Sequence, residues 1–203
     1  VGFQPEDTVF TKQRHTDIVR RVGRENRGEG LLREQTEVCD AQITDEPGVA
    51  LVAFTADCTP ILLFDPVRKA IAAIHAGWRG TALGIAAKTV EAMTRAYGCR
   101  PQNIRAAIGP CIGQCCFETD EDVPQAMRSA LGSEAEACIE RRGEKFHVDN
   151  KALNRIWLTR AGVRCIDISA DCTMCQPERF WSHRVTHGER GSLAAVIRLP
   201  AQR

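Results

Sequence analysis

The sequence lacks an excess of charge of one sign, an apolar run long enough to span a bilayer, and any repeat or low-complexity tract. Its 203 residues include 27 Lys and Arg against 26 Asp and Glu, which gives a formal net charge of +1. Dedicated nucleic-acid-binding domains usually carry a larger basic excess, so the composition argues against nucleic acid as a partner. The longest apolar runs, such as residues 49–56, have the length of a strand, and we therefore expect no membrane segment.

The sequence also lacks a regular cysteine framework and a recognisable signal peptide. Ten cysteines amount to roughly 5% of the chain, below the level typical of disulfide scaffolds. Cys115 and Cys116 are adjacent, an awkward arrangement for two ordinary disulfides. We therefore expect reduced cysteines and a cytoplasmic location.

Three apolar runs separated by short turns, at residues 49–55, 60–64 and 70–74, predict an antiparallel meander. Their continuous apolar character indicates that both faces of the sheet are covered. Further elements are expected from turn and capping signals: helices within 81–97, 122–131 and 150–161, and strands at 9–10, 18–22, 105–108, 164–168 and 193–199. Without a linker between them, these elements predict one α+β domain over residues 1–203.

Cys58 and His75 are the first candidate site. In the predicted meander they leave the same end of the first and third strands, roughly 10 Å apart by two strand spacings. Thiolate and imidazole are ligands that Zn²⁺ or Cu prefers, and the pair would equally suit a Cys-His nucleophile. From spacing alone, a buried cysteine and a hydrogen-bonded histidine remain the simpler interpretation.

The string His-Ala-Gly-Trp-Arg-Gly at residues 75–80 is the second candidate. Its two glycines permit close approach of the backbone to a ligand. The helix expected to start at Gly80 and Thr81 would present its positive end to an anion, and Arg79 would add a phosphate contact. A tight strand-to-helix turn with a surface arginine explains the same pattern equally well.

The remaining cysteines offer a rival metal site. Cys172 and Cys175 form a Cys-x-x-Cys pair, and Cys111, Cys115 and Cys116 cluster after a Gly-Pro turn. The two groups lie about 60 residues apart, outside the compact spacings of zinc fingers and ribbons. The spacing therefore argues against a second metal site.

Other polar residues carry weaker signals. His147, His183 and His187 are more typical of surface or hydrogen-bonded histidines than of ligands. Arg184 and Arg190 lie among glycines near the end of the sequence and are candidates to face a pocket.

Four strings in order along nearly the whole chain resemble the YfiH family, also called the laccase-domain or multicopper polyphenol oxidase family. They are Thr-Ala-Asp-Cys at 55–58, the 75–80 string, Ile-Gly-Pro-Cys-Ile-Gly at 108–113, and Phe-Trp-Ser-His-Arg at 180–184 with Gly191. Residues 12–17 are similar to the start of the family, where a histidine completes a metal site. The resemblance implies His15, Cys58 and His75 as ligands, and a single-domain four-layer α-β-β-α sandwich with antiparallel or mixed sheets. Family members usually carry a further N-terminal segment, which this sequence lacks.

The resemblance implies a cytoplasmic enzyme whose partners are purine nucleosides and phosphate. Expected reactions are phosphorolysis of adenosine, inosine, guanosine or methylthioadenosine, and deamination of adenosine. Other members of the family are described as peptidoglycan-editing amidases or copper-dependent phenol oxidases. A domain with vestigial sites, acting as an interaction module, is the non-enzymatic alternative.

The expected roles follow from these reactions. Zinc, or alternatively copper, would be held by the three ligands, one of them the Cys58 thiolate, and Asp57 would act as proton shuttle or as an orienting group. Arg79 and Arg184 would bind substrate. In an amidase, the metal or the Cys58 thiolate would act on an amide carbonyl. A multicopper laccase needs a cluster rich in imidazole, whereas this sequence has five histidines.

Overall fold

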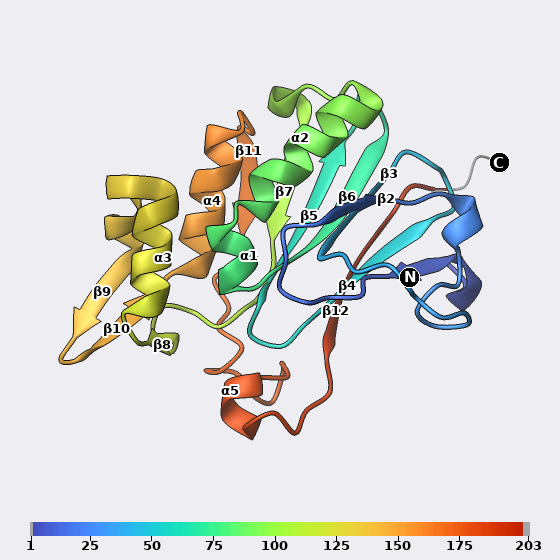
Figure 1. Cartoon of the computed structure of the whole chain (residues 1–203). Coiled ribbons are helices and arrows are strands. Elements are labelled where there is room, and N and C mark those ends of the chain that lie inside the picture. Colours follow the sequence, from blue (N-terminus) through green and yellow to red (C-terminus); the bar gives the residue numbers. More distant parts are fainter. Residues whose placement is uncertain (1, 201–203) are drawn as a thin grey trace.

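A six-stranded mixed sheet forms the centre of the computed structural model, which describes residues 2–200 (Figure 1). Across the sheet the strands are β11 (Cys165–Ile168), β7 (Arg105–Ile108), β5 (Thr59–Asp65), β6 (Ala70–Ala76), β3 (Ala41–Thr44) and β2 (Val19–Arg21). β5 and β6 form an antiparallel hairpin, as predicted. Its turn is closed by Asp65, whose Oδ1 accepts hydrogen bonds from the backbone N–H groups of Val67 and Arg68 at 2.8 and 3.0 Å.

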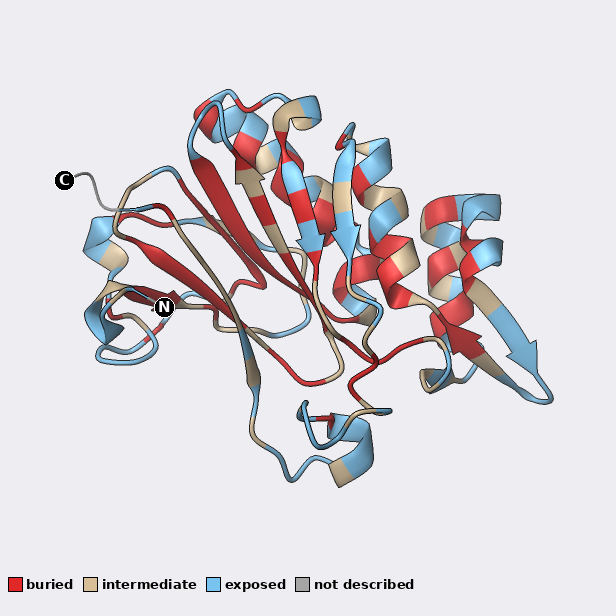
Figure 2. Ribbon diagram, turned by 180° about the vertical axis from the view of Figure 1, so that it is seen from behind, coloured by how far each residue is buried: buried red, intermediate tan, exposed pale blue. Residues whose placement is uncertain are grey.

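The second sheet lies against one face of the first. It consists of β1 (Thr8–Phe10), β4 (Ala50–Thr55) and β12 (Leu193–Arg198), with β4 in the middle. Val9 and Leu51 from this sheet pack with Ile71 and Ala73 from the first. The two sheets therefore enclose one layer of the apolar core, which appears as buried strands in Figure 2.

The predicted meander is wrong at its first strand. β4 pairs with β1 and β12, not with the β5–β6 hairpin. The chain changes sheets in the short turn between β4 and β5, where Asp57 has a left-handed backbone conformation (φ 78°). Nearly all residues of β4 and β5 are buried, so neither strand shows the apolar–polar alternation that could distinguish a hairpin from a crossover between sheets.

Helices cover the opposite face of the large sheet. α2 (Ile85–Tyr97) and α4 (Asn150–Arg160) enclose a second core layer with residues such as Ile61, Ile74 and Met93. The helix predicted to start at Gly80 and Thr81 begins earlier, as α1 (Trp78–Ala82), and is interrupted at Gly84, which has a positive φ of 75°. A Cβ at Gly84 would lie 3.4 Å from the Trp157 ring, so the interruption also permits close packing of α4.

A smaller unit sits beside the helices. It comprises α3 (Asp122–Leu131) and the three-stranded sheet β8 (Glu118–Thr119), β10 (Lys145–Val148) and β9 (Ile139–Arg142). No side chain caps the start of α3, whereas Asp149 caps α4 by accepting from the backbone N–H of Ala152 at 2.9 Å. The remaining elements are α5 (His183–Thr186) and 3₁₀ helices at Pro5–Asp7, Arg24–Asn26, Pro101–Asn103 and Gly132–Cys138.

The predicted single-domain α+β sandwich with mixed sheets is confirmed. Among residues 2–200, no helix combines the length and apolar character that crossing a bilayer requires.

Candidate metal centre and adjoining pocket

The structure brings His15, Cys58 and His75 together at one end of the sheets. Cys58 lies in the turn between β4 and β5, His75 lies near the end of β6 opposite Pro60, and His15 lies in the loop between β1 and β2. Their possible ligand atoms all lie within 4.8 Å of one another. Cys58 therefore approaches His75 across one strand spacing, not across the two that the meander implied.

The donor set and its spacing fit a metal ion. The Sγ atom of Cys58 lies 3.7 Å from Nε2 of His15, close to the roughly 3.6 Å edge of a tetrahedron with zinc bond lengths of about 2.0–2.3 Å. Gly77 makes room for this approach. A Cβ there would lie 2.6 Å from Cδ2 of His15 and 3.2 Å from Sγ of Cys58.

Asp40 organises the site, and sequence reasoning missed it. This fully buried carboxylate lies with Oδ1 2.8 Å from Nδ1 of His75, and the same oxygen accepts from the backbone N–H of His15 at 3.0 Å. Its other oxygen accepts from the backbone N–H groups of Arg14 and Thr16 and from the Thr16 hydroxyl. The contact at Nδ1 leaves Nε2 of His75 for a metal, the usual arrangement of a histidine ligand held by a carboxylate.

The charges of the site are interdependent. Burial opposes ionisation of Asp40, but hydrogen bonds with His75 and Thr16 hold its pKa well below the usual range. Burial likewise disfavours the charged form of His75, yet its contacts with Asp40 and Cys58 raise the pKa of His75 to about 9. Against the effect of burial on Cys58, its contacts with His15 and His75 lower the pKa of Cys58 to about 6. Both shifts favour the pair in which a Cys58 thiolate faces a His75 imidazolium.

A cavity of about 270 Å³ opens beside these side chains. This volume is slightly below the range of about 300–1,000 Å³ common for small-molecule sites. The cavity is lined by two of the three candidate ligands, by apolar and aromatic side chains and by several polar groups: His15, Ala56, Asp57, Cys58, Trp78, Ile112, Phe117, Asn150, His183, Arg184 and Arg190. The pocket therefore combines possible metal ligands, aromatic surfaces and positive charge.

Asp57 lines the cavity with a carboxylate that is already engaged. Oδ1 accepts from the hydroxyl of Thr173 at 2.6 Å. Oδ2 accepts from the hydroxyl of Ser182 at 3.0 Å and from the backbone N–H of Arg184 at 2.7 Å. Asp57 thereby ties the turn that carries Cys58 to the C-terminal loop of the pocket.

The two predicted arginines differ in position. Arg184 lines the cavity, and its two terminal nitrogens donate to the carbonyl of Glu118, each at 3.1 Å. Arg79 is exposed, stacks its guanidinium 4.2 Å from the centroid of the Trp78 ring, and is not among the lining residues. The anion-binding turn expected around Arg79 thus borders the pocket through Trp78.

Two further lining residues escaped the sequence interpretation. Asn150 is buried and donates from Nδ2 to the Thr59 hydroxyl and the Ala76 carbonyl, whereas its Oδ1 has no hydrogen-bond partner within residues 2–200. An asparagine at the start of a helix commonly forms hydrogen bonds with the nearby backbone, so the sequence position of Asn150 carried no functional signal. His183 also lines the cavity, while His147 is buried and hydrogen-bonded, with Nδ1 2.8 Å from the Gln114 carbonyl.

The sandwich with a His/Cys site at the end of its sheets defines a laccase-domain protein. Residues 1–200 match the family described as multi-copper polyphenol oxidoreductase laccase, and the chain belongs to this family. The family resemblance seen in the sequence motifs is thereby confirmed.

Relatives and solved structures agree with this assignment. Purine nucleoside phosphorylase YlmD of Bacillus subtilis (strain 168) is 34% identical over 193 residues, which cover 93% of this chain and 69% of that protein. Adenosine deaminase RL5, from an unknown prokaryotic organism, is 34% identical over 189 residues, covering 91% of this chain and 72% of the relative. The crystal structure of Bacillus licheniformis hypothetical protein YfiH superposes with a TM-score of 0.94 at 35% identity, over 98% of this chain and 76% of that one.

Proposed function

We propose that this protein is a metal-dependent purine nucleoside enzyme that phosphorolyses adenosine, inosine, guanosine or methylthioadenosine and deaminates adenosine. The observation that carries the proposal is the convergence of His15, Cys58 and His75 beside a cavity with aromatic and cationic walls. The names of two relatives, a purine nucleoside phosphorylase and an adenosine deaminase, support the two reactions.

His15, Cys58 and His75 would hold the metal, zinc in our proposal and copper as the alternative. Zinc with three protein ligands keeps a fourth position open and supplies Lewis-acid activation there. The donor set disfavours a multicopper oxidase, which needs further clustered imidazoles. Two of the five histidines already belong to this site, and His147 is engaged with Gln114.

The other lining residues suit a purine nucleoside. Trp78 and Phe117 offer aromatic surfaces for the base, and Arg184 and Arg190 offer positive charge for phosphate. The unpartnered Oδ1 of Asn150 is an acceptor that a hydroxyl or amino group of the substrate would satisfy.

Phosphorolysis breaks the bond between ribose C1′ and the purine nitrogen and forms a bond between C1′ and a phosphate oxygen. The purine leaves with the electron pair of the broken bond and needs a proton. In our proposal the side chain of His183, which lines the cavity, donates that proton. Asp57, with three hydrogen bonds already accepted, acts in our proposal as a positioning residue for Cys58 and Arg184.

Product analysis of the zinc-loaded chain incubated with adenosine tests this function. We expect adenine and ribose 1-phosphate only when phosphate is present, and inosine with or without it. Cys58→Ala should abolish both products and remove one equivalent of metal. Cys165→Ala, which changes an exposed cysteine on β11, is the matched control and should retain both.

The proposal fails if wild-type protein carries the metal that Cys58→Ala loses and yet converts no nucleoside. Release of an amino acid from a muropeptide precursor by that same metal-loaded protein would assign the site to an amidase.

A further inference from the structure

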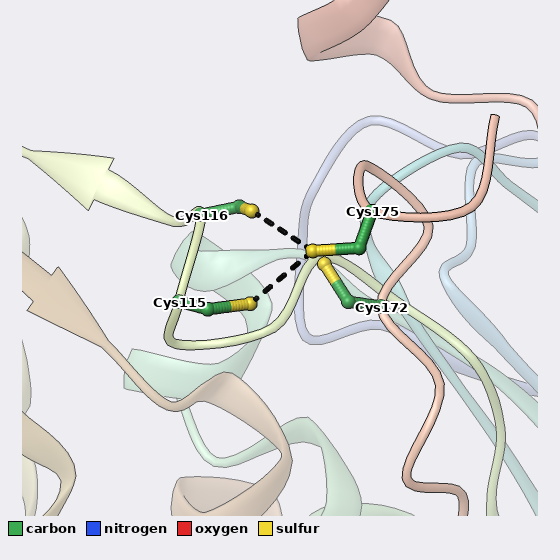
Figure 3. Close-up of side chains that lie close together, drawn as sticks. All are labelled: Cys115, Cys116, Cys172 and Cys175. Atoms are coloured by element: carbon green, nitrogen blue, oxygen red, sulfur yellow. Dashed lines mark hydrogen bonds between the residues drawn. The ribbon is translucent and has the colours of Figure 1, made fainter.

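Four cysteines outside the pocket gather between two loops that are distant in sequence. β7 and β11 are parallel neighbours, so the chain segments that follow them leave the sheet at the same edge. Cys115 and Cys116 lie in the segment after β7, and Cys172 and Cys175 lie in the segment after β11. Figure 3 shows the four side chains directed toward one another.

The sequence separation of about 60 residues argued against a site here, but the structure brings the four cysteines together. The parallel pairing of β7 with β11 places the two segments side by side. A parallel β-bridge, formed by the backbones of Cys111 and Cys172, continues this pairing into the loops. Compact spacing is needed only when one short segment must supply all the ligands.

The spacing of the sulfurs fits a tetrahedral ion. Sγ of Cys175 lies 3.7 Å from that of Cys115 and 3.4 Å from that of Cys116, and all four sulfurs lie within 4.8 Å of one another. Four sulfurs around zinc, at about 2.3 Å each, are separated by roughly 3.8 Å. A disulfide would require about 2.05 Å.

The surrounding backbone suits thiolates. Gly113 donates its N–H to Sγ of Cys172 at 3.1 Å, the kind of outer contact that orients a metal-bound sulfur. A Cβ at Gly113 would lie 3.2 Å from both Sγ of Cys115 and Cβ of Cys172. The glycine thus lets the two loops approach closely at the cluster.

We propose that Cys115, Cys116, Cys172 and Cys175 bind one structural zinc ion. Four protein ligands leave no position for substrate, which is typical of structural zinc sites. The ion would join the loop that carries Phe117 to the loop that carries Thr173. Since Phe117 lines the pocket and Thr173 donates to Asp57, the zinc would stabilise one wall of that pocket.

Metal counting in single variants tests this site separately from the first. Protein purified without chelator should contain two zinc ions per chain, Cys58→Ala should contain one, and Cys175→Ser should lose a different one. The double variant should contain none, and Cys165→Ser should match the wild type. Equal zinc content in Cys175→Ser and the wild type would overturn the proposal, whatever the zinc content of Cys58→Ala.

Cobalt substitution of the wild type keeps the test valid if Cys175→Ser fails to fold. We expect the intense visible and near-ultraviolet absorption of tetrahedral cobalt bound by four thiolates, and this absorption should persist in Cys58→Ala. Thiol titration of the denatured, unreduced protein with chelator should recover all ten thiols. Recovery of eight, with a peptide linking Cys175 to Cys115 or Cys116, would instead assign a disulfide and overturn the zinc site.

Discussion

The His15–Cys58–His75 group and the four-cysteine cluster are organised in opposite ways. The first is anchored by the fully buried Asp40 and by a central strand, and one side of it faces a cavity. The second lies on loops, three of its four cysteines are at least partly exposed, and its sulfurs all lie within 4.8 Å of one another. Packing therefore preforms the His15–Cys58–His75 group, which we call the open site. The four-cysteine cluster, the closed site, depends more on the ion it would bind.

The largest expected effect is a loss of folding stability when the buried anchor of the open site, Asp40, is removed. Asp40→Ala removes a buried acceptor and leaves donors of His75, His15 and Thr16 unpaired. We expect the free energy of unfolding to fall by about 3–5 kcal/mol, as when one partner of a buried ion pair is removed. Urea denaturation measures the change, and Asp45→Ala, at an exposed aspartate, should stay within about 0.5 kcal/mol of wild type. A loss below about 1 kcal/mol would contradict the anchoring role of Asp40.

Two glycine substitutions should each disturb only one of the two candidate metal sites. The added Cβ of Gly77→Ala would press on His15 and Cys58, and that of Gly113→Ala would press on Cys115 and Cys172. We expect each to weaken zinc binding about 10–100-fold at its own group only, the range seen when groups around a metal ligand are disturbed. Competition with a chromophoric chelator measures both affinities. Equal weakening of both groups by either variant would mean that they are not independent.

The arginines test which side of the open site binds the anion. Arg184 lines the cavity, whereas Arg79 lies over the outer face of Trp78. We expect Arg184→Ala to lower kcat/KM for phosphate about tenfold, near the lower end for a charge-assisted hydrogen bond of about 1.5–3 kcal/mol. Arg79→Ala should cost less, since an exposed cation–π contact contributes about 0.5–1 kcal/mol. The reverse order would place the anion site at the turn that precedes α1.

The last expected effect concerns proton release when a metal binds at the His15–Cys58–His75 group. The pKa of His75 is raised to about 9, so at pH 7.5 an entering zinc ion must displace the proton of His75. The pKa of Cys58 is lowered to about 6, so its thiolate requires no such displacement. Zinc affinity at this site should therefore rise by at most about tenfold per pH unit between pH 7 and 9 and level off above. Calorimetry in buffers of different ionisation enthalpy counts the protons, and a flat affinity over that interval would contradict the His75–Asp40 arrangement.

The extent of sequence-based prediction differs between the two groups. Cys58 and His75 were recognised as a possible pair from residue type, and family resemblance added His15. Asp40 was missed because a single aspartate before an apolar strand resembles any turn residue, and only its burial reveals five donors converging on it. The cysteine cluster was rejected because its halves are distant in sequence, although every member had been noticed.

Local chemistry in the sequence determined the β5–β6 turn at Asp65, the cap of α4 at Asp149, the end of α2 at Gly98 and the motifs that mark the family. Each depends on hydrogen bonds or backbone preferences within a few residues, so the residues neighbouring it in the sequence suffice to predict it. Only the tertiary structure decided that β4 belongs to the second sheet and that β7 pairs with β11. Strand partners are selected by burial of apolar faces across the whole chain, and that selection places both the open His/Cys site and the four-cysteine cluster.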